Sequence, residues 1–419
     1  MSVSTLSTVP AAARTATAVV TGLGIAAPNG LGVEPYWAAV LRGESGIGPL
    51  TRFDASGYPV RLAGEISQYR TEEHIHDRLA VQTDRWTHLA LTATEEALAD
   101  AGADPATLPE YEMAVVTSSS SGGTEFGQEE IERLWSRGPR YVGAYQSIAW
   151  FYAATTGQIS IRHGMRGPCG VVAAEQAGAL DALGHARRVV RDGARLVVGG
   201  GTDASLCPYG LVAQLSTGRL STRDDPELAY LPFDARACGH LPGEGGAMLI
   251  VEDAGSAAER GAAHRYGEIV GHASTFDPPP GSGREPGLRR AVMNALIDAR
   301  MAPEEIDVVF ADAAAVPELD RVEAEALAWV FGPRGVPVTA PKAMTGRLYG
   351  GASLDVATAL LAIRDDTIPP SGAPIVPDPR LEIDLVVGEA RPGPVRAALV
   401  VARGHGGMNS ALVLRGPGE

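Results

Sequence analysis

Residues 167–182 read Gly-Pro-Cys-Gly-Val-Val-Ala-Ala-Glu-Gln-Ala-Gly-Ala-Leu-Asp-Ala, and this stretch predicts a buried strand that runs directly into a helix. A strand-to-helix corner exposes one side chain and aims the helix N-terminus at it, which lowers the pKa of a thiol and suits covalent catalysis. Gln176 occupies this corner. Because a glutamine amide only donates and accepts hydrogen bonds, the corner holds no side chain that can carry an acyl group.

Five further segments indicate the kind of scaffold to which this corner belongs. They are residues 19–30 (VVTGLGIAAPNG), 232–234 (PFD), 243–247 (GEGGA), 341–347 (PKAMTGR) and 404–411 (GHGGMNSA). Their order and spacing resemble those of the β-ketoacyl synthase family, and most closely those of the ketosynthase-like chain-length factors (ketosynthase β) of bacterial type II aromatic polyketide synthases. The resemblance covers nearly the whole chain. It implies an α/β fold, the duplicated thiolase fold, layered αβαβα with two pseudo-symmetric halves.

The resemblance also implies a catalytic set of one cysteine and two histidines, and this chain replaces all three. Gln176 stands at the cysteine position, whereas Asp312 and Arg347 stand at the histidine positions. Lys342, the only lysine of the chain, is retained between them. Asp312 would repel an enolate and Arg347 stays protonated, so neither can replace a neutral imidazole. We expect no condensation by this chain alone, and an ion pair between Asp312 and Arg347 in the vacated site.

Strand and helix patterns alternate along the rest of the chain, which predicts layered sheets flanked by helices. In the first half, strands are predicted at 18–24, 113–118, 170–174, 195–200 and 247–252, and helices at 85–101 and 177–191. In the second half, strands are predicted at 267–272, 306–312, 336–340 and 397–403, and helices at 287–299, 320–331 and 352–364. We divide the chain into a flexible N-terminal extension (1–16), an N-terminal β-ketoacyl synthase half (17–255) and a C-terminal half (256–419).

Composition and charge argue against several classes of function. A net charge of −15 disfavours nucleic-acid binding and broad attraction to an acidic acyl carrier protein, so we expect a carrier loaded with malonyl or polyketide chain to dock mainly on a partner. The chain has no run of about 18 apolar residues, so no membrane span is expected. Three cysteines without metal-ligand spacing fit a reducing cytoplasm and no metal site. The glycine runs lack a dinucleotide-binding context, so we expect no cofactor.

A partner and a product tunnel are further implications of the resemblance. Chain-length factors pair with an active ketosynthase α, and the apolar segment 144–156 is a candidate either for that interface or for internal core. They line a polyketide tunnel with a helix after a Gly-Gly turn, which places Thr124, Gly127 and Ile131 on the lining, with Ile148 from the next segment. The first three share one helical face by their spacing. Their small or medium size predicts an open tunnel and a long product, a decaketide or longer.

Three functions stay open on these grounds. The favoured one is a non-condensing subunit that pairs with ketosynthase α and sets polyketide chain length in type II aromatic polyketide (antibiotic or pigment) biosynthesis. The second is an autonomous malonyl-thioester decarboxylase or acyltransferase that uses Gln176 as an oxyanion donor. The third is a free-standing binding or scaffold protein. Within the first, Gln176 either donates to the thioester oxygen during priming decarboxylation or has a structural role.

Overall fold

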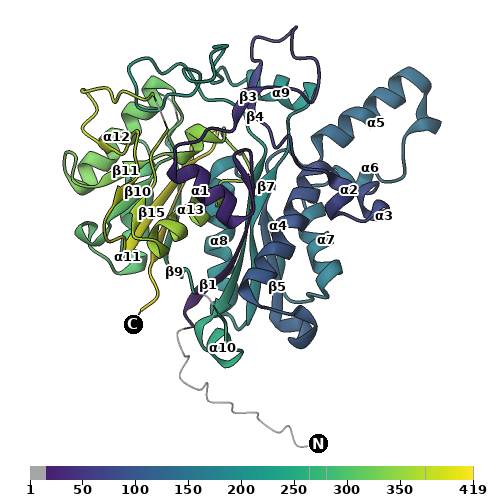
Figure 1. Cartoon of the computed structure of the whole chain (residues 1–419), viewed down its shortest axis with the longest axis horizontal. Coiled ribbons are helices and arrows are strands. Elements are labelled where there is room, and N and C mark those ends of the chain that lie inside the picture. The colour runs from purple at the N-terminus through teal and green to yellow at the C-terminus, as the bar shows by residue number, and fades with distance from the viewer. Residues whose placement is uncertain (1–15, 264, 280, 373, 419) are drawn as a thin grey trace, which may run out of the picture.

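A mixed β-sheet runs through the centre of the protein, for which a computed structural model describes residues 16–418 except 264, 280 and 373 (Figure 1). The predicted N-terminal extension, 1–16, lies outside the described residues except for its last position. The first half contributes β1 (Ala18–Ala27), β5 (Met113–Ser118), β6 (Cys169–Val172), β7 (Leu196–Asp203) and β8 (Gly245–Asp253). The second half contributes β9 (Gly267–Phe276), β10 (Val308–Phe310), β11 (Pro337–Thr339), β13 (Asp384–Leu385), β15 (Ala397–Arg403) and β16 (Met408–Arg415).

The two halves repeat one strand order. It is β1-β8-β7-β5-β6 in the first half and β9-β16-β15-β10-β11 in the second, where β13 is added at the edge. In each half the last strand, β8 or β16, is antiparallel to both neighbours, whereas β5 or β10 is parallel to both. The halves join where Val19 and Val20 of β1 pair with β9. The predicted pseudo-symmetric halves are therefore present, while the boundary at 255/256 stays a prediction.

Two helices, α8 (Glu175–Arg191) and α13 (Ser353–Arg364), form the central helical layer. Both contact strands of both halves. Every residue of α13 except Arg364 is buried, as expected for a helix that is covered on all sides. In α8, a Cβ on Gly184 would lie 2.3 Å from the His272 ring of β9, so a glycine is needed for this close approach.

The outer layers complete the predicted αβαβα arrangement. Helices α4 (Arg85–Ala101) and α7 (Ala154–His163) cover the first-half sheet, and α11 (Leu288–Ala299) covers the second-half sheet with α12 (Pro317–Phe331) against it (Figure 1). The start and end of α4 match the sequence prediction because Asp84 caps its first turn and Gly102 ends it in the left-handed conformation, with φ of 59°. None of the helices in the described ranges is long and apolar enough to cross a membrane.

An arm projects from this body beside α7 (Figure 1). It consists of α5 (Thr124–Arg137), the 3-10 turn η3 (Pro139–Tyr141) and α6 (Gln146–Ala149). The other elements are short or peripheral: β2 (Gly30–Leu31), α1 (Val33–Leu41), β3 (Ile47–Pro49), β4 (Leu62–Gly64), α2 (Thr71–His74), α3 (Asp77–Ala80), η1 (Pro105–Thr107), η2 (Glu110–Glu112), α9 (Pro208–Leu215), α10 (Ala254–Glu259), η4 (Pro303–Glu305), η5 (Pro341–Met344), β12 (Thr367–Ile368) and β14 (Arg391–Pro392).

Candidate functional site

Gln176 lies at the start of α8, where the chain turns from β6 into the helix. Its side chain is 1% exposed, and its Nε2 atom has no hydrogen-bond partner among the described residues. The preceding residue, Glu175, has a positive φ of 48°, which is uncommon for a residue other than glycine and marks a strained corner. The Glu175 carboxylate accepts a hydrogen bond from the backbone N–H of His405 at 2.6 Å. The corner is thus tied to the 404–411 segment.

The predicted ion pair between Asp312 and Arg347 is confirmed. Nη2 of Arg347 lies 2.7 Å from Oδ1 of Asp312, and both side chains are buried. The same guanidinium donates to the carbonyl oxygens of Asp312 and Arg403, each at 2.8 Å. The backbone N–H of Arg403 donates to Oδ1 of Asp312 at 2.7 Å. The pair is therefore held from two further sides by the main chain.

Charge balance fixes the protonation of this pair. Burial alone would raise the pKa of Asp312, but the charges of Arg347, Lys342 and Arg403 outweigh burial and hold that pKa below its usual value. Although burial opposes it, the anionic partner Asp312 raises the pKa of Arg347. Both groups are therefore charged at neutral pH. A fixed anion and a fixed cation cannot give and take a proton as a neutral imidazole does.

Lys342 forms a second buried ion pair beside the first. Its Nζ atom lies 2.7 Å from Oδ2 of Asp355, on α13 of the central layer. Glu323 completes the surroundings by accepting from the N–H groups of Asp312 and Ala313, at 2.7 and 3.0 Å. Burial, helped by the Asp312 charge, raises the pKa of Glu323 to about 7. Lys342, which lies in the 341–347 motif, therefore helps to hold η5 against α13 in this chain.

His240 and Tyr349 are site residues that no sequence motif indicates. Nε2 of His240 lies 3.1 Å from the Tyr349 hydroxyl, and its Nδ1 lies 3.3 Å from the carbonyl oxygen of Ala314. Burial and the Arg347 charge lower the pKa of His240 to about 3, so the ring is neutral. A neutral imidazole thus lies near the ion pair, but its ring nitrogens already face Tyr349 and a backbone carbonyl.

The space left between these groups is small. A cavity of about 70 Å³ is lined by residues that include Glu175, His240, Asp312, Arg347 and Tyr349. Pockets that bind small molecules usually have volumes of at least ~300 Å³. The cavity is much smaller than such a pocket, and the charged Asp312 and Arg347 side chains form part of its lining.

A larger pocket of about 260 Å³ adjoins this cavity and shares Glu175, Thr217 and Tyr349 with it. Thr124, at the start of α5, lines this pocket, as do Trp150 and the hydroxyl-bearing residues Ser120, Ser121, Tyr152, Ser205 and Tyr209. Trp150 and Tyr209 were not among the predicted lining residues. The aromatic residues at 150–152 are evident in the sequence, but the sequence does not indicate that they face a pocket.

The four predicted tunnel residues separate in the structure. Thr124 lines the 260 Å³ pocket, and Gly127 lies one turn further along α5 against the Trp150 ring. In contrast, Ile131 is 48% and Ile148 is 39% exposed, on the arm and away from the pocket. The shared helical face is buried only over its first turn because α5 then leaves the body. A lining role for Ile131 and Ile148 stays a prediction that requires a partner to cover them.

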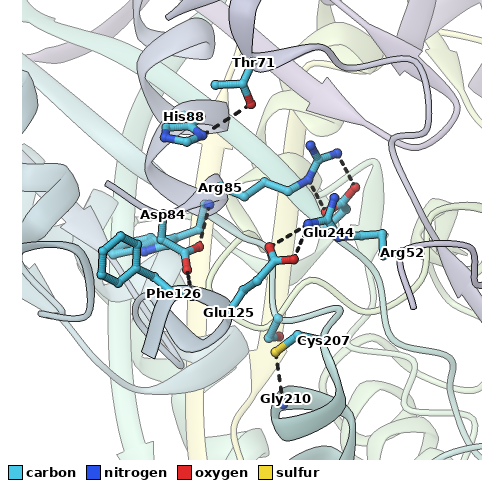
Figure 2. Close-up of polar contacts among 12 residues, drawn as sticks. Arg52, Thr71, Asp84, Arg85, His88, Glu125, Phe126, Cys207, Gly210 and Glu244 are labelled. Carbon is cyan, nitrogen blue, oxygen red and sulfur yellow. Dashed lines mark hydrogen bonds and ion pairs between the residues drawn. The ribbon is translucent and has the colours of Figure 1, made fainter. Parts of the chain in front are cut away.

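A buried carboxylate fixes the arm to the body (Figure 2). Asp84 caps α4 by accepting from the N–H of Trp86 at 3.3 Å, and its other oxygen accepts from the N–H of Phe126 in α5 at 2.8 Å. One side chain therefore serves the N-terminal turns of two helices. Burial raises the pKa of Asp84 to about 7.

Two ion pairs flank this carboxylate (Figure 2). Arg52 pairs with Glu125 of α5 at 2.6 Å, and Arg85 of α4 pairs with Glu244 at 2.7 Å. Glu244 belongs to the 243–247 motif and also accepts from the N–H of Ile66 at 2.8 Å. The motif thus holds loops and helices together. Across the described ranges, no group of three or more His, Cys, Asp and Glu side chains is arranged to hold a metal.

Comparison with known proteins places this geometry in a family. The model of the β-ketoacyl synthase N-terminal domain matches residues 16–257, and that of the C-terminal domain matches residues 266–373. The chain belongs to the β-ketoacyl synthase family. A match to the β-ketoacyl synthase of Burkholderia phymatum, with a TM-score of 0.89 at 24% identity over 96% of this chain and 100% of the other, shows the shared thiolase fold.

Several relatives are closer in sequence. The tetracenomycin polyketide synthase ketoacyl synthase beta subunit of Streptomyces glaucescens is 61% identical over 95% of this chain and 98% of its own length. The actinorhodin polyketide putative beta-ketoacyl synthase 2 of Streptomyces coelicolor is 57% identical over the same shares. Among solved structures, the ishigamide ketosynthase/chain length factor matches with a TM-score of 0.88 and 26% identity, over 97% of this chain and all of the other.

Proposed function

We propose that this chain is the non-condensing subunit of a type II aromatic polyketide synthase, and that it pairs with an active ketosynthase α and sets the length of the polyketide. The observation that carries the proposal is the buried Asp312–Arg347 ion pair, in the small cavity that is also lined by Glu175, the neighbour of Gln176. It supplies neither a thiolate nor a free neutral imidazole, both of which decarboxylative condensation requires. A scaffold of this family without condensing chemistry acts through a partner that has it.

The exposed aromatic residues support a protein partner. Trp150, Phe151 and Tyr152, within the predicted segment 144–156, are all exposed, and Trp135 on α5 of the same arm is 83% exposed. Contiguous exposed apolar surface is typical of a protein–protein interface. Among the described residues no strand pairs with the outer edge of β6, so a strand of a partner can be added to the sheet there. Similar relatives are named as a beta subunit and as a ketosynthase/chain length factor.

The remaining features of the proposal follow from charge and pocket lining. The net charge of −15 keeps the acyl carrier protein, with its malonyl or polyketide chain, mainly on the partner. Thr124, Gly127, Ile131 and Ile148 leave the tunnel open, and the product is a decaketide or longer. The chain acts in the cytoplasm and needs no cofactor for this role.

A second candidate is supported by the unpaired Nε2 of Gln176. A buried amide donor without a partner is suited to bind a thioester oxygen, as an autonomous malonyl-thioester decarboxylase or acyltransferase would require. Gln176 is 1% exposed and lines neither the 70 Å³ cavity nor the 260 Å³ pocket, which opposes this reading because a thioester has no access to the amide. The subunit role is therefore preferred.

Co-expression with a ketosynthase α tests the partnership. The two chains should elute together from a size-exclusion column, and Phe151→Ser, which places a polar group in the exposed aromatic segment, should weaken this co-elution. Ile297→Ser is the matched control, because Ile297 is 68% exposed, against 56% for Phe151, but lies on α11 of the opposite outer layer. Separate elution of the wild-type chains, with malonyl turnover by this chain alone, would support the autonomous enzyme instead.

A further inference from the structure

We propose that the indole of Trp150 is the end wall of the 260 Å³ pocket and is itself the residue that limits product length. This inference rests on the proposed function. It assigns the limit to a side chain that follows α6, whereas the sequence pattern assigns it to the face of α5. The ligand that meets this wall is the growing poly-β-ketoacyl chain.

The contact between Trp150 and α5 explains why Gly127 is a glycine. A Cβ built on Gly127 would lie 2.6 Å from Cδ1 and 3.2 Å from Nε1 of the Trp150 ring. The indole therefore lies directly on the helix backbone, in the space that any other side chain would occupy. Trp150 and Thr124 line the same pocket, so the residue whose ring covers Gly127 also forms part of the pocket wall.

The backbone at Trp150 is held in place by the turn that precedes α5. The carbonyl oxygen of Trp150 accepts from the N–H of Gly123 at 3.4 Å, and a Cβ on Gly122 would lie 2.6 Å from that oxygen. Gly122 also has a positive φ of 63°, so both the close approach of this oxygen and the backbone conformation favour a glycine there. Because its backbone is held, the indole of Trp150, a residue that is 46% exposed, gives way to a side chain at position 127 by rotating about its side-chain bonds, away from α5.

The pocket lining fits a chain with a carbonyl on every second carbon. Hydroxyl groups of Ser120, Ser121 and Tyr209 can donate hydrogen bonds to such carbonyls, whereas the Thr124 hydroxyl already donates to the carbonyl oxygen of Ser121 at 3.1 Å. The aromatic wall contains two rings, since the Trp150 and Tyr152 centroids lie 6.3 Å apart. Polar donors along the sides and an aromatic surface at the end give a pocket whose depth is set by the indole.

Product masses from the reconstituted complex with ketosynthase α and malonyl carrier protein test the inference. Trp150→Ala should lengthen the main product by one or more two-carbon units. Gly127→Ala should shorten it by pushing the indole into the pocket, without weakening α5, because alanine is the better helix former. In the Trp150→Ala background, Gly127→Ala should have no further effect. Trp329→Ala, an exposed tryptophan on α12 outside both the pocket and the proposed interface, is the control and should leave product length unchanged.

The outcomes separate this inference from the proposed function. Unchanged product length in both Trp150→Ala and Gly127→Ala, with the heterodimer intact and polyketide still made, overturns the role of Trp150 alone. Shortening by Gly127→Ala that persists in the Trp150→Ala background also overturns it, since the limit then lies on α5. If Trp150→Ala fails to assemble, Trp150→Phe paired with Gly127→Ala decides in the same way. Polyketide of unchanged length made without this chain overturns the proposed function itself.

Discussion

Replacing Asp312 with asparagine should cost much more stability than a change of one charge usually does. Asp312→Asn keeps the size of the side chain and an oxygen that can accept from the N–H of Arg403, but it removes the carboxylate 2.7 Å from Arg347. The guanidinium stays buried and keeps its two backbone carbonyl acceptors, but it meets a neutral amide oxygen in place of the carboxylate. Breaking a buried pair in this way costs about 3–5 kcal/mol, and we expect a value at the lower end because those hydrogen bonds remain.

Urea unfolding at pH 7, followed by tryptophan fluorescence, measures this loss. Asp224→Asn is the matched control, because Asp224 and Arg61 form an exposed ion pair at 3.3 Å, and such pairs contribute about 0–1 kcal/mol. The double variant Asp312→Asn with Arg347→Met should recover most of the stability, since neither charge of this ion pair is then left buried without its partner. A loss in Asp312→Asn no larger than in the control would refute the reasoning that the ion pair holds the vacated site together.

Three further predictions concern residues outside this pair. Gln176→Ala in the complex should leave malonyl decarboxylation and polyketide yield within about tenfold, or 1.4 kcal/mol in barrier, because the side chain is 1% exposed and lines neither of the two adjoining pockets; a larger drop would favour a catalytic amide. Thr124→Phe and Gly127→Phe should each shorten the product by at least one two-carbon unit, as mass spectrometry would show; unchanged length in an intact complex would count against the pocket. Burial raises the pKa of Asp84 to about 7, so the folded chain holds more protons than the unfolded chain between about pH 4 and 7. The free energy of unfolding should therefore fall as the pH rises through this range. An equally steep fall in Asp84→Asn would contradict this prediction.

Local signals were enough to predict the regular elements. The bounds of α4, β5 and β15 match the predictions at 85–101, 113–118 and 397–403, since each has a strong cap or an uninterrupted apolar run. The strand predicted at 306–312 is shorter, because β10 ends at Phe310 and the chain turns toward the ion pair. Strand β16 was not predicted, since its segment carries the motif at 404–411 and the turn that follows β15.

The site was predictable only where a motif marked it. Gln176, Asp312 and Arg347 stand in recognisable segments, and opposite charges on the last two were enough to predict their pairing. No sequence motif identifies His240 or Trp150 as a site residue. His240 becomes a site residue through contacts with Ala314 and Tyr349, each more than 70 positions away in the chain. Contacts of this kind depend on how the two halves pack, and no local pattern reports them.

The most direct test of the central claim is an assay with labelled malonyl and acetyl carrier thioesters. The purified chain alone should form no β-ketoacyl product, and ketosynthase α with this chain should form a polyketide of decaketide length or longer. Product mass should change when pocket residues of this chain are changed. Formation of β-ketoacyl product by the chain without a partner would contradict the account, as would polyketide of the same length from ketosynthase α alone.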